Sequence, residues 1–260
     1  MTVIPKALRR RTPEQRTGTM TVMEHLEELR HRLIICSITI AFAAIPAWLL
    51  YGPFRNLIQH PYCHYVQSLP VASQPPAGCN LVFTGLLDGM LVKLKIVLFL
   101  GLAISLPVLL YQLWAFIVPG LHARERKMAI PFIASSVVLF ATGAAFAYVL
   151  LPKGLNFLLG FAGSGVVPLI SFDHYVGFVV LLAIAFGVSF EFPVMLIFLL
   201  LVGVLNTSQL RRVRRFAILG IAVFAAVITP SSDIYTMLGL MIPMVLFYEA
   251  AIIVGRLLKR

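Results

Sequence analysis

Charged residues are scarce in this chain of 260 residues: they make up 12%, roughly half the share found in soluble domains. Because 60% of the residues are hydrophobic, too few polar side chains remain to cover a soluble globule of this size. The 3 cysteines, 18 glycines and 16 prolines are ordinary numbers, which excludes a disulfide scaffold, a collagen and a disordered chain. The composition therefore indicates an integral membrane protein.

Acidic residues are the scarcest charged type, with 10 Asp and Glu against 21 Lys and Arg and a formal net charge of +11. In a membrane protein this excess is typical of basic loops held on the cytoplasmic side. No zinc finger, RNA-binding signature or helix-turn-helix motif supports nucleic-acid binding. Residues 1–19 contain no apolar segment of a cleavable signal peptide, so we expect them to form a disordered basic cytoplasmic tail.

Six apolar runs come near the ~20 residues that a helix needs to cross a bilayer. They cover residues 33–54, 96–121, 128–152, 175–205, 216–229 and 234–255. When both termini are placed in the cytoplasm, all Lys and Arg fall on the inner side except Arg55, Lys93, Lys95 and Lys153. A seventh span would reverse this bias.

The glycine-rich stretch 154–172 is poor helix material, and we expect it to be an outer loop with an interfacial piece. The sequence thus predicts an all-α integral membrane protein with six transmembrane helices and both ends inside. Its membrane domain covers residues 20–255, and 256–260 form a basic cytoplasmic end. The fifth and sixth spans are short, which we expect to thin the membrane beside them.

The segment TVMEHLEELRHRL precedes and enters the first span. Thr21 and Glu24 have the spacing of a capping box, so we predict that Thr21 caps a helix. Glu27, Glu28 and Arg30 follow near the membrane surface. The pattern alone favours a solvated amphipathic helix start.

The second span ends in YQLWAFIVPGLHARERK, where Pro119 and Gly120 stop the helix. Glu125 is the single acid of this inner loop and is flanked by basic residues. An exposed ion pair within the loop is the structural alternative to a binding role.

Glu191 in FGVSFEFPV lies roughly midway along the fourth apolar run. An ionisable group at membrane depth is a functional candidate by default, and a packed neutral acid is the alternative. We expect it to face the concave side of the bundle. In the ITPSSD segment, Asp233 is placed to cap the last helix, and Thr229, Thr236 and Met237 are candidates for contact with a partner helix.

Two cysteines, Cys63 and Cys79, fall in the first outer loop, where they are either disulfide-bonded or free. His60, Cys63 and His64 are too few for a convincing metal site, and we expect neither metal nor cofactor. The sequence contains no nucleotide-binding or hydrolase motif, so we expect no enzyme activity.

Four of these motifs, HLEELRHRL, YQLWAFIVPGLHARERK, FGVSFEFPV and ITPSSD followed by LMIPMVLFYE, stand in the order found in TatC proteins. The chain resembles this family from about Met20 to about Ile253. The family is the multi-spanning core of the twin-arginine protein translocase. The resemblance implies six helices in a curved, glove-like bundle in the cytoplasmic membrane, with both termini cytoplasmic.

The resemblance also implies a function and partners. It implies a receptor for twin-arginine signal peptides that works with single-span TatA and TatB proteins, associates with itself and exports folded proteins by the proton-motive force. By motif match, Glu28 and Glu125 are the signal-binding carboxylates, with Arg30 and Phe116 beside them. In place of the Ser/Thr-Gln common in the family, Thr236 is followed here by Met237.

Two other functions fit parts of the sequence. A proton-coupled solute transporter would use Glu191 as its proton carrier, but no internal repeat supports it. A purely structural scaffold would show no dependence on an arginine pair. The basic inner surface favours a receptor with a local acidic patch, since arginine is the cation suited to bidentate carboxylate recognition.

Overall fold

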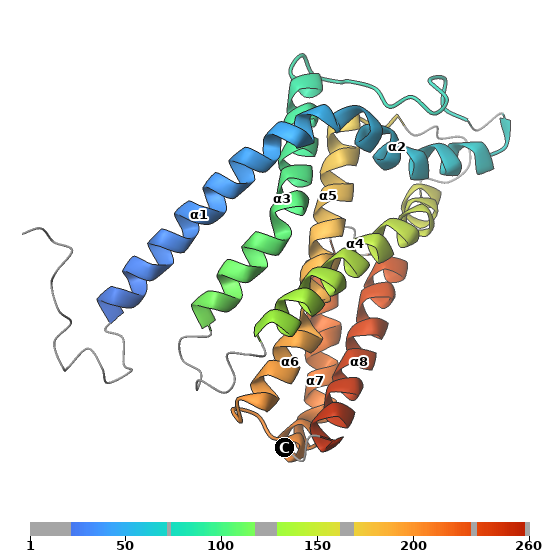
Figure 1. The fold of residues 1–260 in the computed structure, drawn as a ribbon. Coiled ribbons are helices and arrows are strands. Elements are labelled where there is room, and N and C mark those ends of the chain that lie inside the picture. The colour runs from blue at the N-terminus through green and yellow to red at the C-terminus, as the bar shows by residue number, and fades with distance from the viewer. Residues whose placement is uncertain (1–21, 72–73, 118–128, 162–168, 230–232, 258–260) are drawn as a thin grey trace, which may run out of the picture.

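The computed structural model describes residues 22–71, 74–117, 129–161, 169–229 and 233–257. Within these ranges the chain forms eight helices and one isolated β-bridge, between Val82 and Ser171. The helices are α1 (Val22–Leu49), α2 (Tyr51–Ser68), α3 (Asp88–Ile117), α4 (Ala129–Gly160), α5 (Phe172–Ser189), α6 (Phe192–Leu201), α7 (Thr207–Ile228) and α8 (Ile234–Leu257) (Figure 1). The predicted all-α fold is confirmed.

Five helical segments are long and apolar enough to cross a membrane: α1, α3, α4, α5 with α6, and α8. The remaining predicted span, the fifth, is α7, whose arginine-rich first turns precede an apolar stretch that reaches Ile228. With 22 and 24 residues, α7 and α8 are shorter than the other spans. At ~1.5 Å per residue, however, the whole of α8 can cross a bilayer; only its charge-free part, between Asp233 and Glu249, is short.

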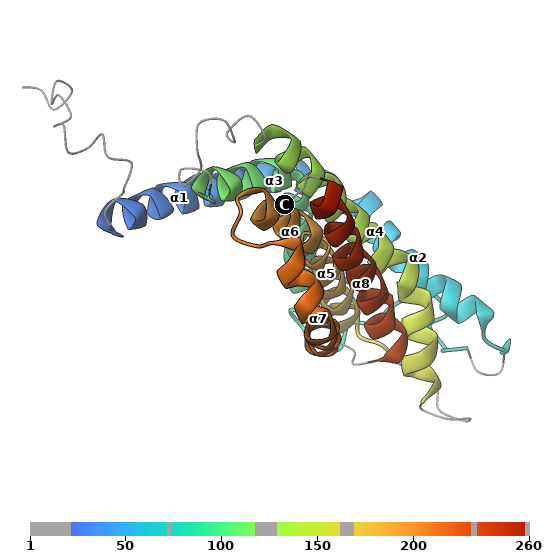
Figure 2. The same cartoon turned by 90° about the horizontal axis from the view of Figure 1, so that it is seen from below.

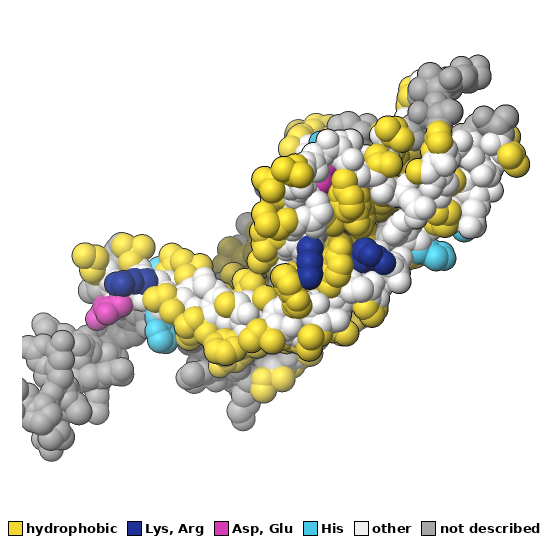
Figure 3. All heavy atoms as spheres, turned by 90° about the horizontal axis from the view of Figure 1, so that it is seen from above, with side chains coloured by type: hydrophobic (Ala, Val, Ile, Leu, Met, Phe, Trp, Pro, Cys, Tyr) yellow, Lys and Arg dark blue, Asp and Glu magenta, His cyan; other side chains and the backbone are white. Residues whose placement is uncertain are grey.

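The first arm of the molecule consists of α1 and α3, which extend together from the bundle of α4 to α8 (Figures 1 and 2). The two helices pack closely at Gly101 of α3, where a Cβ would be in ordinary contact, 3.4 Å from the backbone nitrogen of Ala44 in α1. Most of the remaining α1 surface is apolar and exposed, and hydrophobic side chains spread along it in Figure 3. A lipid environment suits this arm, whose outer face has no other covering among the described residues.

The helix α2 was not predicted, because the sequence suggested that the first span ends near Phe54 and continues as a loop. It lies across the upper ends of neighbouring helices in Figure 1, where it contacts α3 and α4. Pro61 has no N–H, so it cannot donate to the Leu57 carbonyl one turn earlier. The Tyr148 hydroxyl of α4 donates to that carbonyl at 3.0 Å, and the Tyr175 hydroxyl of α5 donates to the Ile58 carbonyl at 2.8 Å. Hydrogen bonds from α4 and α5 therefore stabilise a helix that is only weakly indicated by its own sequence.

Two further boundaries differ from the prediction. The helix α3 begins at Asp88 rather than near residue 96, and its Lys93 and Lys95 side chains contact residues of α1 and α5. The Lys93 ammonium lies 3.6 Å from the centre of the Trp48 ring, and Lys95 pairs with Asp173 of α5 at 2.7 Å. These contacts allow charged residues to lie inside a helix at its outer end.

The first part of the expected outer loop 154–172 is helical, because α4 continues past Pro152 to Gly160. Gly154 packs on the start of α8, where a Cβ would lie 3.2 Å from Cγ2 of Thr236. Glycine at this position therefore permits helix contact rather than marking a loop.

Cys63 of α2 is joined to Cys79 by a disulfide, with their Cα atoms 4.7 Å apart. The bridge ties α2 to the segment that connects it to α3. Because the Cys63 sulfur is bonded, it is not available as a metal ligand beside His60 and His64.

Candidate functional site

The N-terminal end of α1 holds the first group of predicted site residues. The Glu28 carboxylate is half-buried and forms an ion pair with Arg32, one turn further along the helix. Arg32 reaches across to α3, where it donates to Oε1 of Gln112 at 2.9 Å and to the Ala115 carbonyl at 3.0 Å. Arg32 and Gln112 were not singled out from the sequence, although the four-residue spacing of Glu28 and Arg32 is a signal for such a pair.

Phe116 of α3 contacts the same segment of α1. Its ring stacks on His25, with ring centres 4.3 Å apart and planes at 19°. Glu27 and Arg30 of α1 are exposed to solvent on the same segment. The structure thus brings four predicted residues, Glu27, Glu28, Arg30 and Phe116, to the end of the α1–α3 arm where α1 begins and α3 ends.

Three predicted residues lie outside the described part of the chain: Thr21, Pro119 and Glu125. The proposed helix cap and the second signal-binding carboxylate therefore stay predictions.

Glu191 occupies a break between α5 and α6 rather than the middle of one continuous helix. Pro193 cannot donate a backbone hydrogen bond, and the chain turns at Phe190 and Glu191 before α6 begins. Ser136 of α4 lies beside the Glu191 carboxyl group, and Nε1 of Trp114 donates to the Ser136 hydroxyl at 3.1 Å. Oε1 of Glu191 is buried and has no hydrogen-bond partner in the described residues.

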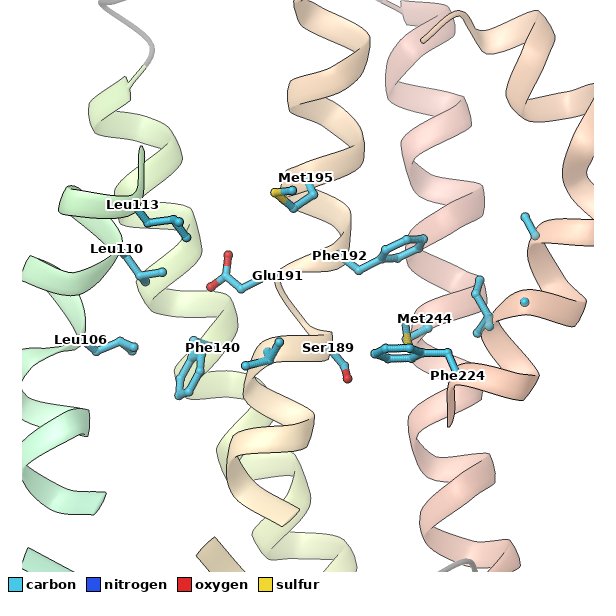
Figure 4. Close-up of a pocket in the computed structure, with 14 residues that line it drawn as sticks. Leu106, Leu110, Leu113, Phe140, Ser189, Glu191, Phe192, Met195, Phe224 and Met244 are labelled. Atoms are coloured by element: carbon cyan, nitrogen blue, oxygen red, sulfur yellow. The ribbon is translucent and has the colours of Figure 1, made fainter. Parts of the chain in front are cut away.

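The Glu191 side chain lies on the wall of a cavity of about 690 Å³ (Figure 4). Leu106, Leu110 and Leu113 of α3 form one side, and Phe224 of α7 and Met244 of α8 belong to the other. An almost wholly apolar hollow with one carboxyl group suits an apolar helix that carries a single polar side chain. The break in the helix, which sequence periodicity did not show, is what turns Glu191 toward it.

Three polar residues that flank the connection between α7 and α8, Thr229, Asp233 and Thr236, hydrogen-bond within the chain. Oδ1 of Asp233 accepts a hydrogen bond from the Thr236 backbone N–H at 2.8 Å, which caps α8 as predicted. The Thr236 hydroxyl donates to Oδ2 of Asp233, and the Thr229 hydroxyl donates to the Ala225 carbonyl at 2.8 Å. Both threonine side chains are buried in this chain, whereas Met237 is half-buried. A partner helix at this connection would therefore meet Met237 before either threonine.

Comparison with known proteins connects these features to one family. The model of the family described as "Sec-independent protein translocase protein (TatC)" matches residues 24–243. The chain belongs to the TatC family. The matched region contains Glu28, Phe116 and Glu191 and all of the spans up to Pro243.

Individual TatC proteins are similar over nearly the whole chain. The chain is 42% identical over 253 residues to the Sec-independent protein translocase protein TatC of Frankia casuarinae, covering 96% of this chain and 70% of that protein. It is 36% identical over 239 residues to the TatC of Escherichia coli K12, covering 92% and 89%. A crystal structure of "Twin Arginine Translocase Receptor- TatC" has a TM-score of 0.73 at 35% identity, covering 91% of this chain and 100% of that one. The TatC fold is thus shared from α1 to α8.

Proposed function

We propose that this chain is the twin-arginine signal-peptide receptor and core subunit of a Sec-independent translocase, which exports folded proteins by using the proton-motive force. The observation that carries the proposal is the Glu28 carboxylate, which already binds a guanidinium at the end of the α1–α3 arm where α1 begins. Membership of the TatC family supports it.

Charge explains why a carboxylate is needed there. The chain has a formal net charge of +11, so its basic surface repels a peptide with two arginines unless acids attract it locally. Glu28 and Glu125 are the proposed partners of the two guanidinium groups, with Glu27, Arg30 and Phe116 beside them. Arginine presents five N–H donors in a planar fork, whereas lysine presents a point charge, which explains a requirement for arginine.

The cavity beside Glu191 is the proposed place for a single-span partner of the TatA or TatB type. Its lining is apolar, and the buried Oε1 of Glu191 offers one polar contact. Met237 and the exposed residues Ile234 and Tyr235 at the start of α8 offer a second contact surface. Self-association of the chain is part of the same proposal.

The proposed location is the cytoplasmic membrane with both termini in the cytoplasm. The distribution of Lys and Arg supports this orientation. Reporter fusions after Arg215 and after Arg260 should both be active only as cytoplasmic reporters, and an external result for either would reverse the topology.

The experiment that tests the function is co-purification with a precursor that carries a twin-arginine signal peptide and with its Lys-Lys variant. We expect the twin-arginine precursor to be retained and the variant to be lost. Equal retention of both would identify a membrane scaffold or transporter instead.

A further inference from the structure

The Glu28 carboxylate is already occupied by a guanidinium from its own helix. Nε of Arg32 donates to Oε1 of Glu28 at 3.0 Å, and Nη2 of Arg32 donates to the same oxygen. The two side chains are only 20% and 19% exposed, so the pair is largely removed from water. Arg32 therefore fills the position in which a signal-peptide arginine would bind.

The second oxygen of Glu28 does not offer an open alternative. Oε2 is buried, and no described residue hydrogen-bonds it. An incoming guanidinium can reach this carboxylate only if the Glu28 side chain turns away from Arg32. In the present arrangement the site is closed.

Arg32 has a place to remain when Glu28 leaves it. Its Nη1 and Nη2 atoms also donate to Gln112 and to the Ala115 carbonyl on α3, at 2.9 and 3.0 Å. Neither acceptor depends on the position of the Glu28 side chain. Exchange therefore breaks the hydrogen bonds between Arg32 and Glu28 and leaves those between Arg32 and α3 intact.

We propose that Arg32 is a built-in competitor for the signal-peptide site, holding Glu28 closed until an arginine of the signal peptide displaces it. This proposal rests on the proposed function, since it requires Glu28 to bind the signal peptide. It adds a regulation of that site: a peptide must outcompete an intramolecular guanidinium, which raises the threshold for weakly binding sequences.

Competition leaves a quantitative signature. If a fraction of the molecules is open, the apparent dissociation constant of every ligand increases by the inverse of that fraction. Removing Arg32 should therefore tighten the binding of a twin-arginine peptide and of its Lys-Lys variant by the same factor. A residue that merely positions Glu28 would act in the opposite direction, and its loss would weaken the twin-arginine peptide most.

The test is peptide binding to the full-length protein in nanodiscs, with fluorescent twin-arginine and Lys-Lys signal peptides. We expect Arg32→Gln to lower both dissociation constants about tenfold and to leave their ratio unchanged. A tenfold change corresponds to the strength of one charge-assisted hydrogen bond, which the peptide then no longer has to displace. Arg32→Lys should lower both by a smaller, equal factor, because lysine keeps the charge but not the fork. Arg212→Gln on exposed α7 removes the same charge and should change neither.

Opposite results overturn the proposal. Weaker or unchanged binding of the twin-arginine peptide in both folded Arg32 variants would exclude a competitor. Should Arg32→Gln fail to fold, Arg32→Lys still gives the equal-factor test. Failure of the proposed function looks different, because the wild-type protein would then not distinguish the two peptides.

Discussion

Gly143 is the position where a single methyl group should disturb both packing and the Glu191 site. Gly143 of α4 faces α5, and a Cβ there would lie 2.6 Å from the Phe186 carbonyl oxygen and 2.9 Å from Cγ of Phe190. Ordinary contact begins near 3.4 Å, so the shortfall is roughly 0.8 Å and falls on backbone, which cannot rotate away. Phe190 directly precedes Glu191 at the helix break.

For Gly143→Ala we expect the packing cost of an overfilled core, about 1–3 kcal/mol in the free energy of unfolding. Because alanine has a higher helix propensity than glycine, the substitution also stabilises the helix by up to ~1 kcal/mol, which offsets part of the packing cost. Gly220→Ala is the matched control, because it gains the same propensity in mid-helix while nothing lies within 4 Å of its Cβ.

The assay is thermal unfolding of both variants in the same detergent, followed by transport of a twin-arginine precursor for Gly143→Ala. Gly143→Ala should have the lower Tm and reduced transport, since separation of α4 from α5 moves the turn that carries Glu191. Equal Tm values for the two variants would refute this account of the α4–α5 contact.

Three other changes test separate contacts. Tyr148→Phe removes the donor to the Leu57 carbonyl and should lower stability by about 1 kcal/mol, seen as a lower Tm; an unchanged Tm would show that water replaces it. Replacing Cys63 and Cys79 by serine should lower the free energy of unfolding by ~3 kcal/mol, the chain-entropy contribution of a disulfide that closes a loop of this length, seen as a lower Tm. If both cysteines of the non-reduced wild-type protein can be alkylated, no bridge forms. Glu191→Gln should keep much of the transport and Glu191→Leu should lose it if the side chain acts by hydrogen bonding; equal failure of both would favour a proton carrier.

Sequence reasoning predicts the spans well, because a bilayer demands long apolar helices and because basic residues gather on one side. It misses α2, since Gly52, Pro53 and Pro61 argue against a helix and the stabilising contacts come from Tyr148 and Tyr175, far away in sequence. Such contacts are visible only once the fold is known.

The candidate site residues likewise fall into those that the sequence predicts and those that only the fold reveals. An acid at membrane depth is evident from residue type, which singles out Glu191, whereas Glu28 was predicted only through the resemblance to the TatC family. Contacts with other helices are not evident in this way: Arg32, the partner of Glu28 on the same helix, also donates to Gln112 of α3, and Ser136 of α4 lies beside Glu191. The break before α6 follows from Pro193, a signal present in the sequence but concealed by the continuous apolar run.

The most direct test of the central claim is the affinity of the Glu28→Ala, Glu125→Ala double variant for a twin-arginine precursor. Removing one partner of a desolvated charge pair costs ~2–5 kcal/mol, so each single variant should bind at least tenfold more weakly and the double variant should lose measurable binding. Wild-type affinity in a double variant with an unchanged Tm would contradict the assignment of these carboxylates to the signal-peptide site.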